Sequence, residues 1–219
     1  MVRRTKEEAL ATRHKLLDAA EQLFLAQGVS RTSLQDIARR AGATRGAVYW
    51  HFKDKADLFN AMMERVTLPM EQSFDVDAHN GAAPHGPDAN PLDHIRRATL
   101  KALSQIVNDA RTRCVFEVAT HKVEYVEELH AVRLRHLAAR DGFVQRVEQS
   151  LGMATRQLNV TLAMPASTAA QGLHALIDGL IQNWLLNPEA FDLLEVGQCV
   201  MNAYLKGLGF PGPQDKNTP

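Results

Sequence analysis

The stretch from Thr32 to Lys55 constrains the fold of this chain more than any other. Ser33, with Asp36 three residues later, forms an acidic variant of the capping box that starts a helix. Gly42 follows that short helix, and because glycine lacks a Cβ atom it permits a left-handed turn. A second short apolar pattern begins at Thr44, and alanines in both patterns allow the two helices to cross closely. The spacing therefore predicts a helix-turn-helix.

The second helix of such a pair enters the major groove of DNA with its amino-terminal residues toward the base edges. Here those residues are Thr44, Arg45 and Gly46. Arg45 is suited to a bidentate contact with guanine, and Thr44 either caps the helix or touches a base. Gly46 lets the backbone approach DNA closely.

Phosphate contacts are predicted from the residues that follow. Tyr49 and His51 offer polar groups, while the amphipathic ring of Trp50 can brace the helix against its neighbours or the DNA backbone. The next helix, capped by Asp54, presents free N–H groups that form an anion site with Lys55. The predicted DNA-binding residues are Thr32, Ser33, Gln35, Thr44, Arg45, Gly46, Tyr49, Trp50, His51 and Lys55.

The distribution of charge agrees with DNA binding at one end, although chance partitioning is an alternative explanation. Residues 1–68 carry 12 Lys and Arg against 8 Asp and Glu, and the remaining residues carry 13 against 17. A basic amino-terminal part on an acidic body suits a protein that touches phosphate with one end only. Arg3, Arg4 and Lys6 are predicted to form a basic arm that adds affinity for any DNA sequence.

The whole chain is predicted to be all-α. Aromatic residues make up only 6% of it, and no stretch alternates cleanly between apolar and polar residues. Gly28 ends the first helix, and a fourth helix runs from Lys55 until Pro69 disturbs it. Further helices are predicted at residues 92–107, 110–121, 125–152, 167–186 and 193–208. The predicted domains are a three-helix DNA-binding head (1–54), a larger helical ligand-binding and dimerisation domain (55–210) with a flexible loop at 75–90, and a disordered tail (211–219).

Composition excludes several other classes of protein. Hydrophobic residues make up 45% and charged residues 23%, as in ordinary globular proteins, and no apolar run reaches the roughly 18 residues that span a bilayer. We expect a cytoplasmic protein without membrane contact. Cys114 and Cys199 lie far apart without metal-ligand spacing and are predicted to be small buried residues. No signature of a phosphate loop, serine hydrolase or metalloprotease occurs, so neither an enzyme, a cofactor nor a metal is predicted.

The residues of the predicted helix-turn-helix, from Gly28 to Ala38 and from Ala41 to Lys55, resemble the signature of the TetR/AcrR family of transcriptional repressors. The opening residues 1–13 and the stretches DARTR (109–113) and DGLIQNWLL (178–186) resemble the subgroup that represses genes for multidrug efflux pumps. The resemblance implies an all-helical repressor that leaves its operator DNA when a hydrophobic or aromatic inducer binds.

The resemblance also implies a homodimer in which the last two long helices pack against their twins. The sequence agrees, because these helices carry wide apolar faces, although completion of the monomer core is an alternative. The residues predicted for the dimer interface are Leu173, Leu180, Trp184, Val196, Val200 and Tyr204.

An apolar ligand pocket is implied in the carboxy-terminal part, with a few polar groups among many apolar ones. Its predicted lining is Val66, Leu100, Leu103, Phe116, Glu117, Thr120, Val144, Val147, Leu151, His174, Ile177, Asp178, Ile181 and Gln182. Close relatives carry polar Asn and His groups where this chain has Phe116 and Thr120, and for each residue core packing is an alternative. Two other functions stay open: a DNA-binding protein with a nucleoid or protein-partner role and no small ligand, and an activator.

Overall fold

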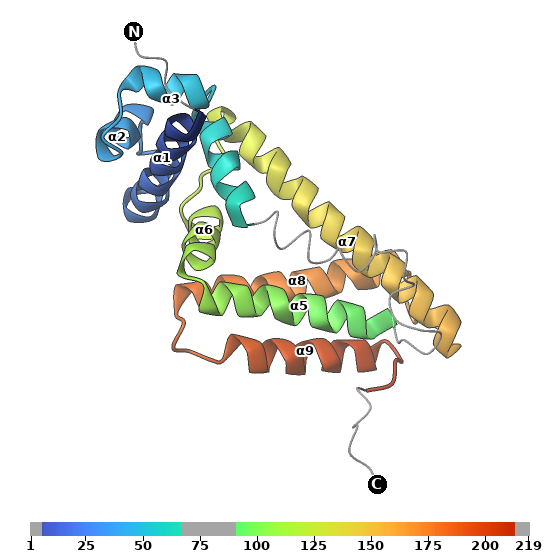
Figure 1. Ribbon diagram of the computed structural model, residues 1–219. Helices are drawn as coiled ribbons and strands as arrows, with labels where there is room; N and C mark the ends of the chain where they lie inside the picture. Colours follow the sequence, from blue (N-terminus) through green and yellow to red (C-terminus); the bar gives the residue numbers. More distant parts are fainter. Residues whose placement is uncertain (1–5, 67–90, 213–219) are drawn as a thin grey trace. The chain divides into compact units, whose positions relative to one another are not determined.

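The computed structural model describes residues 6–66 and 91–212. Every regular element in these residues is helical, which confirms the all-α prediction (Figure 1). The predicted loop at 75–90, Pro69, and Arg3 and Arg4 of the basic arm lie outside the described residues, as does all of the predicted tail except residues 211 and 212.

The described chain divides into two compact units. We call residues 6–66 and 110–137 the head unit, and residues 91–109 and 138–212 the body unit. The head unit thus contains residues 55–66 and 110–137 in addition to the predicted DNA-binding domain, whose boundary at residue 54 stays a prediction.

The head unit begins with α1 (Lys6–Gln27), α2 (Leu34–Arg40) and α3 (Arg45–His51), and residues 55–66 form a further helical segment. Gly28 ends α1 with a φ of 87°, and Gly42 turns the chain between α2 and α3 with a φ of 63°. Both are left-handed conformations that glycine adopts without steric cost, so both predicted turns are confirmed. α6 (Ala110–His121), the 3₁₀ turn η1 (Glu127–Leu129) and the start of α7 (His130–Leu158) complete this unit.

One apolar core holds the head unit together. Phe24 of α1 and Phe59 of the 55–66 segment lie at its centre, with ring centroids 6.0 Å apart. Ile37 of α2 and Val48 of α3 are fully buried in the same cluster, together with Val118 of α6. Burial of this apolar area fixes the two short helices, which would be unstable alone.

The body unit contains α5 (Pro91–Asn108), the rest of α7, α8 (Ala166–Leu186) and α9 (Leu193–Gly207). α9 packs against both α5 and α8 (Figure 1). Two glycines allow this packing: a Cβ atom on Gly197 would overlap Leu103 of α5, and one on Gly172 of α8 would overlap the hydroxyl of Tyr204. The Tyr204 hydroxyl donates to the carbonyl of Ala169 at 2.9 Å, a bond that joins α9 to α8.

Two expectations from the sequence are wrong. The helix predicted at 125–152 begins only at His130, because Val126 is extended and a 3₁₀ turn precedes the helix, and it continues to Leu158. Both cysteines were expected to be buried, but Cys114 is half-buried and Cys199 is exposed. Cys199 lies on the solvent-facing side of α9, away from the face that carries the buried residues Gly197 and Met201.

Candidate nucleic-acid interface

The start of α2 is fixed by the predicted capping box. The Ser33 hydroxyl accepts from the backbone N–H of Asp36 at 3.1 Å, and the Asp36 carboxylate accepts from the backbone N–H of Ser33 at 3.2 Å. Two hydrogen bonds from Ser33 lower the pKa of Asp36. The bond from the Ser33 hydroxyl has the larger effect and the bond from its backbone N–H the smaller one. Ser33 and Gln35 are exposed at this end of the helix, so both are available to an external partner.

The start of α3 is capped in the same way by Thr44, whose hydroxyl accepts from the backbone N–H of Ala47 at 3.2 Å. This confirms the capping role predicted for Thr44. Thr44, Arg45 and Gly46 are all exposed. Arg45, the predicted base-reading side chain, therefore lies in the exposed first turn of α3.

Aromatic side chains follow along α3. Tyr49 is half exposed, and Trp50 is 72% exposed, so Trp50 does not brace α3 against the described core. The Trp50 ring lies edge-on to His51, with centroids 4.5 Å apart. Tryptophan side chains are on average highly buried in folded proteins, so the exposure of Trp50 is unusual.

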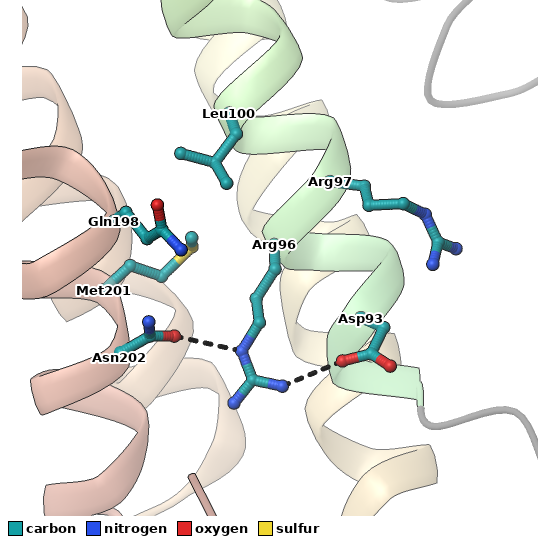
Figure 2. Close-up of a pocket in the computed structure, with 7 residues that line it drawn as sticks. All are labelled: Asp93, Arg96, Arg97, Leu100, Gln198, Met201 and Asn202. Carbon is teal, nitrogen blue, oxygen red and sulfur yellow. Dashed lines mark hydrogen bonds and ion pairs between the residues drawn. The ribbon is translucent and has the colours of Figure 1, made fainter. Parts of the chain in front are cut away.

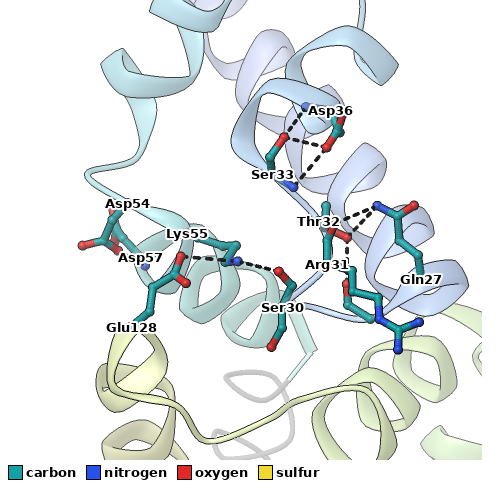
Figure 3. Close-up of polar contacts among 11 residues, drawn as sticks. Gln27, Ser30, Arg31, Thr32, Ser33, Asp36, Asp54, Lys55, Asp57 and Glu128 are labelled. Carbon is teal, nitrogen blue, oxygen red and sulfur yellow. Dashed lines mark hydrogen bonds and ion pairs between the residues drawn. The ribbon is translucent and has the colours of Figure 1, made fainter.

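Thr32 and Lys55, both predicted to contact DNA, are buried. Figure 3 shows their polar contacts. The Thr32 hydroxyl donates to the carbonyl of Gly28 at 2.8 Å and accepts from Gln27 at 3.1 Å, so it stabilises the end of α1. Lys55 is held inside the head unit by Ser30 and by Glu128, a residue that the sequence did not single out. Both side chains are thus buried in this structure, and the DNA contacts predicted for them stay predictions.

The predicted cap of the segment 55–66 is confirmed. The Asp54 carboxylate accepts from the backbone N–H of Asp57 at 2.8 Å. The Asp57 carboxylate in turn accepts from the backbone N–H of Lys53 at 2.9 Å. Both carboxylates are thus engaged by backbone groups at the start of this segment.

An ion-pair cluster ties α1 to α6 and to the segment 55–66. Arg65 lies 2.8 Å from both Asp18 and Glu21, while Arg111 of α6 lies 2.9 Å from Asp18 and 3.3 Å from Glu21. Burial raises the pKa of Glu21, and this desolvation outweighs the opposing effects of Arg65 and Arg111. No sequence spacing predicted this cluster, because its members are up to 93 residues apart.

The residues predicted to line a ligand pocket come from both units. In the head unit, Val66 is buried, Phe116 and Glu117 are half-buried, and the Thr120 hydroxyl donates to the carbonyl of Phe116 at 2.6 Å. In the body unit the apolar members are mostly buried, whereas the polar ones are less so. Buried are Leu103, Val144, Val147, Leu151 and Ile177; half-buried are Leu100, His174, Asp178 and Ile181; Gln182 is exposed and donates to Asp178.

A cavity of about 210 Å³ lies elsewhere in the body unit, between α5 and α9 (Figure 2). Among the predicted pocket residues, Leu100 alone lines it. Its wall includes Arg96, a buried arginine that bonds Asp93 at 3.0 Å and Asn202 at 3.1 Å. The second terminal nitrogen of Arg96, Nη2, finds no hydrogen-bond partner among the described residues.

The residues predicted for a dimer interface differ in exposure. Leu173 is fully buried and Trp184 is 5% exposed, so both complete the core of the body unit itself. Leu180, Val196, Val200 and Tyr204 are half-buried and retain surface on α8 and α9. Leu176 and Leu186 of α8 are more exposed than any of these.

Among residues 6–66 and 91–212, no helix is long and apolar enough to cross a membrane.

Two family descriptions match the chain in adjacent parts. Residues 16–62 match "Bacterial regulatory proteins, tetR family", which covers the helix-turn-helix described above. Residues 90–210 match "MAATS-type transcriptional repressor, C-terminal region".

Individual relatives agree over most of the chain. The HTH-type transcriptional regulator TtgR of Pseudomonas putida is 38% identical over 195 residues, 89% of this chain and 90% of that protein. The structure of NalD, the secondary repressor of the MexAB-OprM multidrug efflux pump in Pseudomonas aeruginosa, matches with a TM-score of 0.81 at 36% identity, over 91% of this chain and 98% of that one. The SmeT–triclosan complex matches with a TM-score of 0.75 at 30% identity, over 95% of this chain and 99% of that one, and SmeT represses the Stenotrophomonas maltophilia efflux pump SmeDEF. With its capped and exposed α3 and these matches along its length, the chain belongs to the TetR family of bacterial regulatory proteins.

Proposed function

We propose that this protein is a repressor that binds operator DNA through α3, controls a multidrug efflux operon and releases the DNA when a hydrophobic compound binds. The exposed, Thr44-capped start of α3, with Arg45 and Tyr49 beside it, carries the DNA-binding part of the proposal. Similarity to efflux-pump repressors supports the regulated operon. A regulator of this kind acts in the cytoplasm, where the DNA is.

The inducer site is proposed to draw on the predicted residues of α7 and α8. In the body unit, the ring of Phe143 packs edge-on against His174 at 5.6 Å between centroids, and Val147 and Ile177 of the same two helices are buried. Apolar walls with a few polar side chains such as Asp178 suit an aromatic or amphipathic compound. The complex of SmeT with triclosan supports a compound of this class.

We further propose that the functional form is a homodimer joined through α8 and α9. Leu176 and Leu186 expose apolar area on α8 that the monomer does not cover. Two heads are also what a palindromic operator requires, since each head reads one half-site.

Fluorescence anisotropy at fixed salt tests the proposal. The protein is titrated into labelled DNA from upstream of its own gene and the adjoining operon, and into a random duplex of equal length, with and without a panel of hydrophobic antibiotics and flavonoids. Specific binding that a compound reverses supports the repressor. Specific binding that no compound alters favours the second candidate, a regulator without a small ligand, and equal binding to random DNA contradicts the proposal.

A further inference from the structure

Lys55 is a buried cation held by two oxygen atoms of the head unit (Figure 3). Its Nζ lies 3.3 Å from a carboxylate oxygen of Glu128 and donates to the carbonyl of Ser30 at 3.4 Å. The Lys55 side chain is 9% exposed, whereas that of Glu128 is 63% exposed. A lysine buried this far needs a compensating negative charge, and Glu128 supplies it.

The other carboxylates at this end of the segment are already engaged. Asp54 and Asp57 accept hydrogen bonds from backbone N–H groups, as described above. Glu128 lies in η1, and its carboxylate lies within ion-pair distance of Lys55, the first residue of the segment 55–66.

A DNA phosphate bound near the start of this segment would require the same ammonium group. Lys55 sits at the first turn, where the free backbone N–H groups also attract an anion. While the Lys55 ammonium is paired with Glu128, its positive charge is already compensated. In that state it cannot neutralise a DNA phosphate and so causes no release of counterions from the DNA. The carboxylate and the phosphate are therefore alternative partners of one cation.

We propose that Glu128 competes with DNA phosphate for Lys55 and so sets how tightly the head unit binds any DNA sequence. Glu128 is separated from the first residue of α7 by Leu129 alone, and α7 continues into the body unit. A change at the start of α7 thus alters the availability of Lys55. This inference rests on the proposed DNA-binding function.

The test compares Glu128→Gln with Glu127→Gln in the full-length protein. Both variants remove one exposed negative charge from η1, but only Glu128 contacts Lys55 among the ion pairs of the described residues. Anisotropy titrations are run on the upstream and random duplexes between about 50 mM and about 300 mM salt. We expect Glu128→Gln to tighten binding to both duplexes by roughly fivefold at low salt and to steepen the slope of log K against log salt by up to about 1. Glu127→Gln is expected to change affinity by less than about twofold at physiological salt, because screening weakens its distant effect.

A second pair of variants assigns the effect to Lys55. In a Lys55→Met background, Glu128→Gln is expected to change DNA affinity no more than Glu127→Gln does. Circular dichroism and thermal unfolding verify that each variant is folded before it is titrated.

The outcomes separate two kinds of failure. Equal effects of the two glutamine variants, weaker binding by Glu128→Gln, or a Glu128→Gln effect that persists without Lys55 each overturn the competition. Lack of any preference of the wild-type protein for the upstream duplex overturns the proposed operator binding instead, and that result is read from the wild-type titrations alone.

Discussion

The guanidinium of Arg45 lies over the ring of Tyr49, one turn later on α3, with its central carbon 5.5 Å from the ring centroid. Its Nη2 also lies 3.5 Å from the Tyr49 hydroxyl. Both side chains are exposed. The aromatic ring therefore restricts the directions that the guanidinium takes, which would lower the entropy cost of the proposed base contact.

Replacing Arg45 by Ala is expected to weaken operator binding by about 1–3 kcal/mol and to relax specificity at one base pair. Arg45→Lys is expected to recover little of the specificity, because an ammonium lacks the planar fork of a guanidinium. Anisotropy on an operator series with single base-pair changes measures both effects. A loss that is equal for operator and random DNA would show that Arg45 contacts phosphate instead of a base.

Removing the cap of α2 by Ser33→Ala is expected to lower the free energy of unfolding by about 1 kcal/mol, measured by urea denaturation. It also changes the pH dependence. Because the folded pKa of Asp36 is lowered, its stabilisation is complete above the unfolded pKa and is lost as pH falls through the folded pKa. Ser33→Ala removes the main cause of the lowered pKa, so its stability should fall less steeply in acid than that of the wild type. Parallel acid profiles of the two proteins would contradict the role of the capping box.

Removing a basic residue and removing an acidic residue from the ion-pair cluster should lower stability by unequal amounts. Arg65→Met leaves the buried carboxylate of Glu21 with less compensation and is expected to cost about 2 kcal/mol, between the values of exposed and buried pairs. Glu21→Gln should cost less, because burial already disfavours the ionised form. Arg140→Met, which removes an arginine paired with the exposed Asp141, serves as the control and should change stability by less than about 0.5 kcal/mol.

The pH dependence of Glu21 has the opposite sign to that of Asp36. Since the folded pKa of Glu21 is raised, the folded state holds its proton longer than the unfolded state does. Stability is therefore lost as pH rises from the unfolded pKa through the raised folded pKa, and Glu21→Gln should abolish that loss. Urea denaturation across the weakly acidic range measures it, and an unchanged profile in the variant would assign the loss to other groups.

The contact between Gly172 and Tyr204 predicts a non-additive pair of substitutions. Gly172→Ala places a Cβ atom against the Tyr204 hydroxyl and should destabilise the protein by about 1–3 kcal/mol. Tyr204→Phe removes that oxygen and its hydrogen bond to Ala169, which should lower the free energy of unfolding by about 1 kcal/mol. The double variant should lose less than the sum of the two.

Gly179→Ala is the matched control on α8, because no atom lies within 4 Å of the added Cβ among the described residues. It should be neutral or stabilising by up to about 1 kcal/mol, since alanine favours helix. All variants are compared at one protein concentration, because association alters apparent stability. Equal losses in Gly172→Ala and Gly179→Ala would contradict a specific overlap with Tyr204.

Local spacing made part of this structure predictable. Three helix caps and one turn each depend on residues within three positions, so the adjacent sequence determines their geometry. These are the caps at Ser33, Thr44 and Asp54 and the turn at Gly42. The helices of the body unit follow from apolar periodicity in the same way. Exposure of Arg45 and Tyr49 agrees with their place in the helix-turn-helix.

Burial of polar side chains was not predictable, because it depends on residues far away in the sequence. Thr32 is polar and lies in a turn, yet its hydroxyl is satisfied by the end of α1. Lysine is typically a surface residue. Only the fold brings Glu128, 73 positions later, to the ammonium group of Lys55. The ion pairs of Glu21 with Arg65 and Arg111 arise equally from packing that no periodicity encodes.

The two tryptophans of the chain lie in contrasting surroundings, with Trp50 exposed on the head unit and Trp184 enclosed in the body unit. Indole emits at longer wavelength in water than in an apolar interior, so the intrinsic fluorescence of this protein has two separable components. Collisional quenching by iodide reaches the first and spares the second. Without any label, fluorescence can therefore report separately on the surroundings of Trp50 and of Trp184 in a single sample.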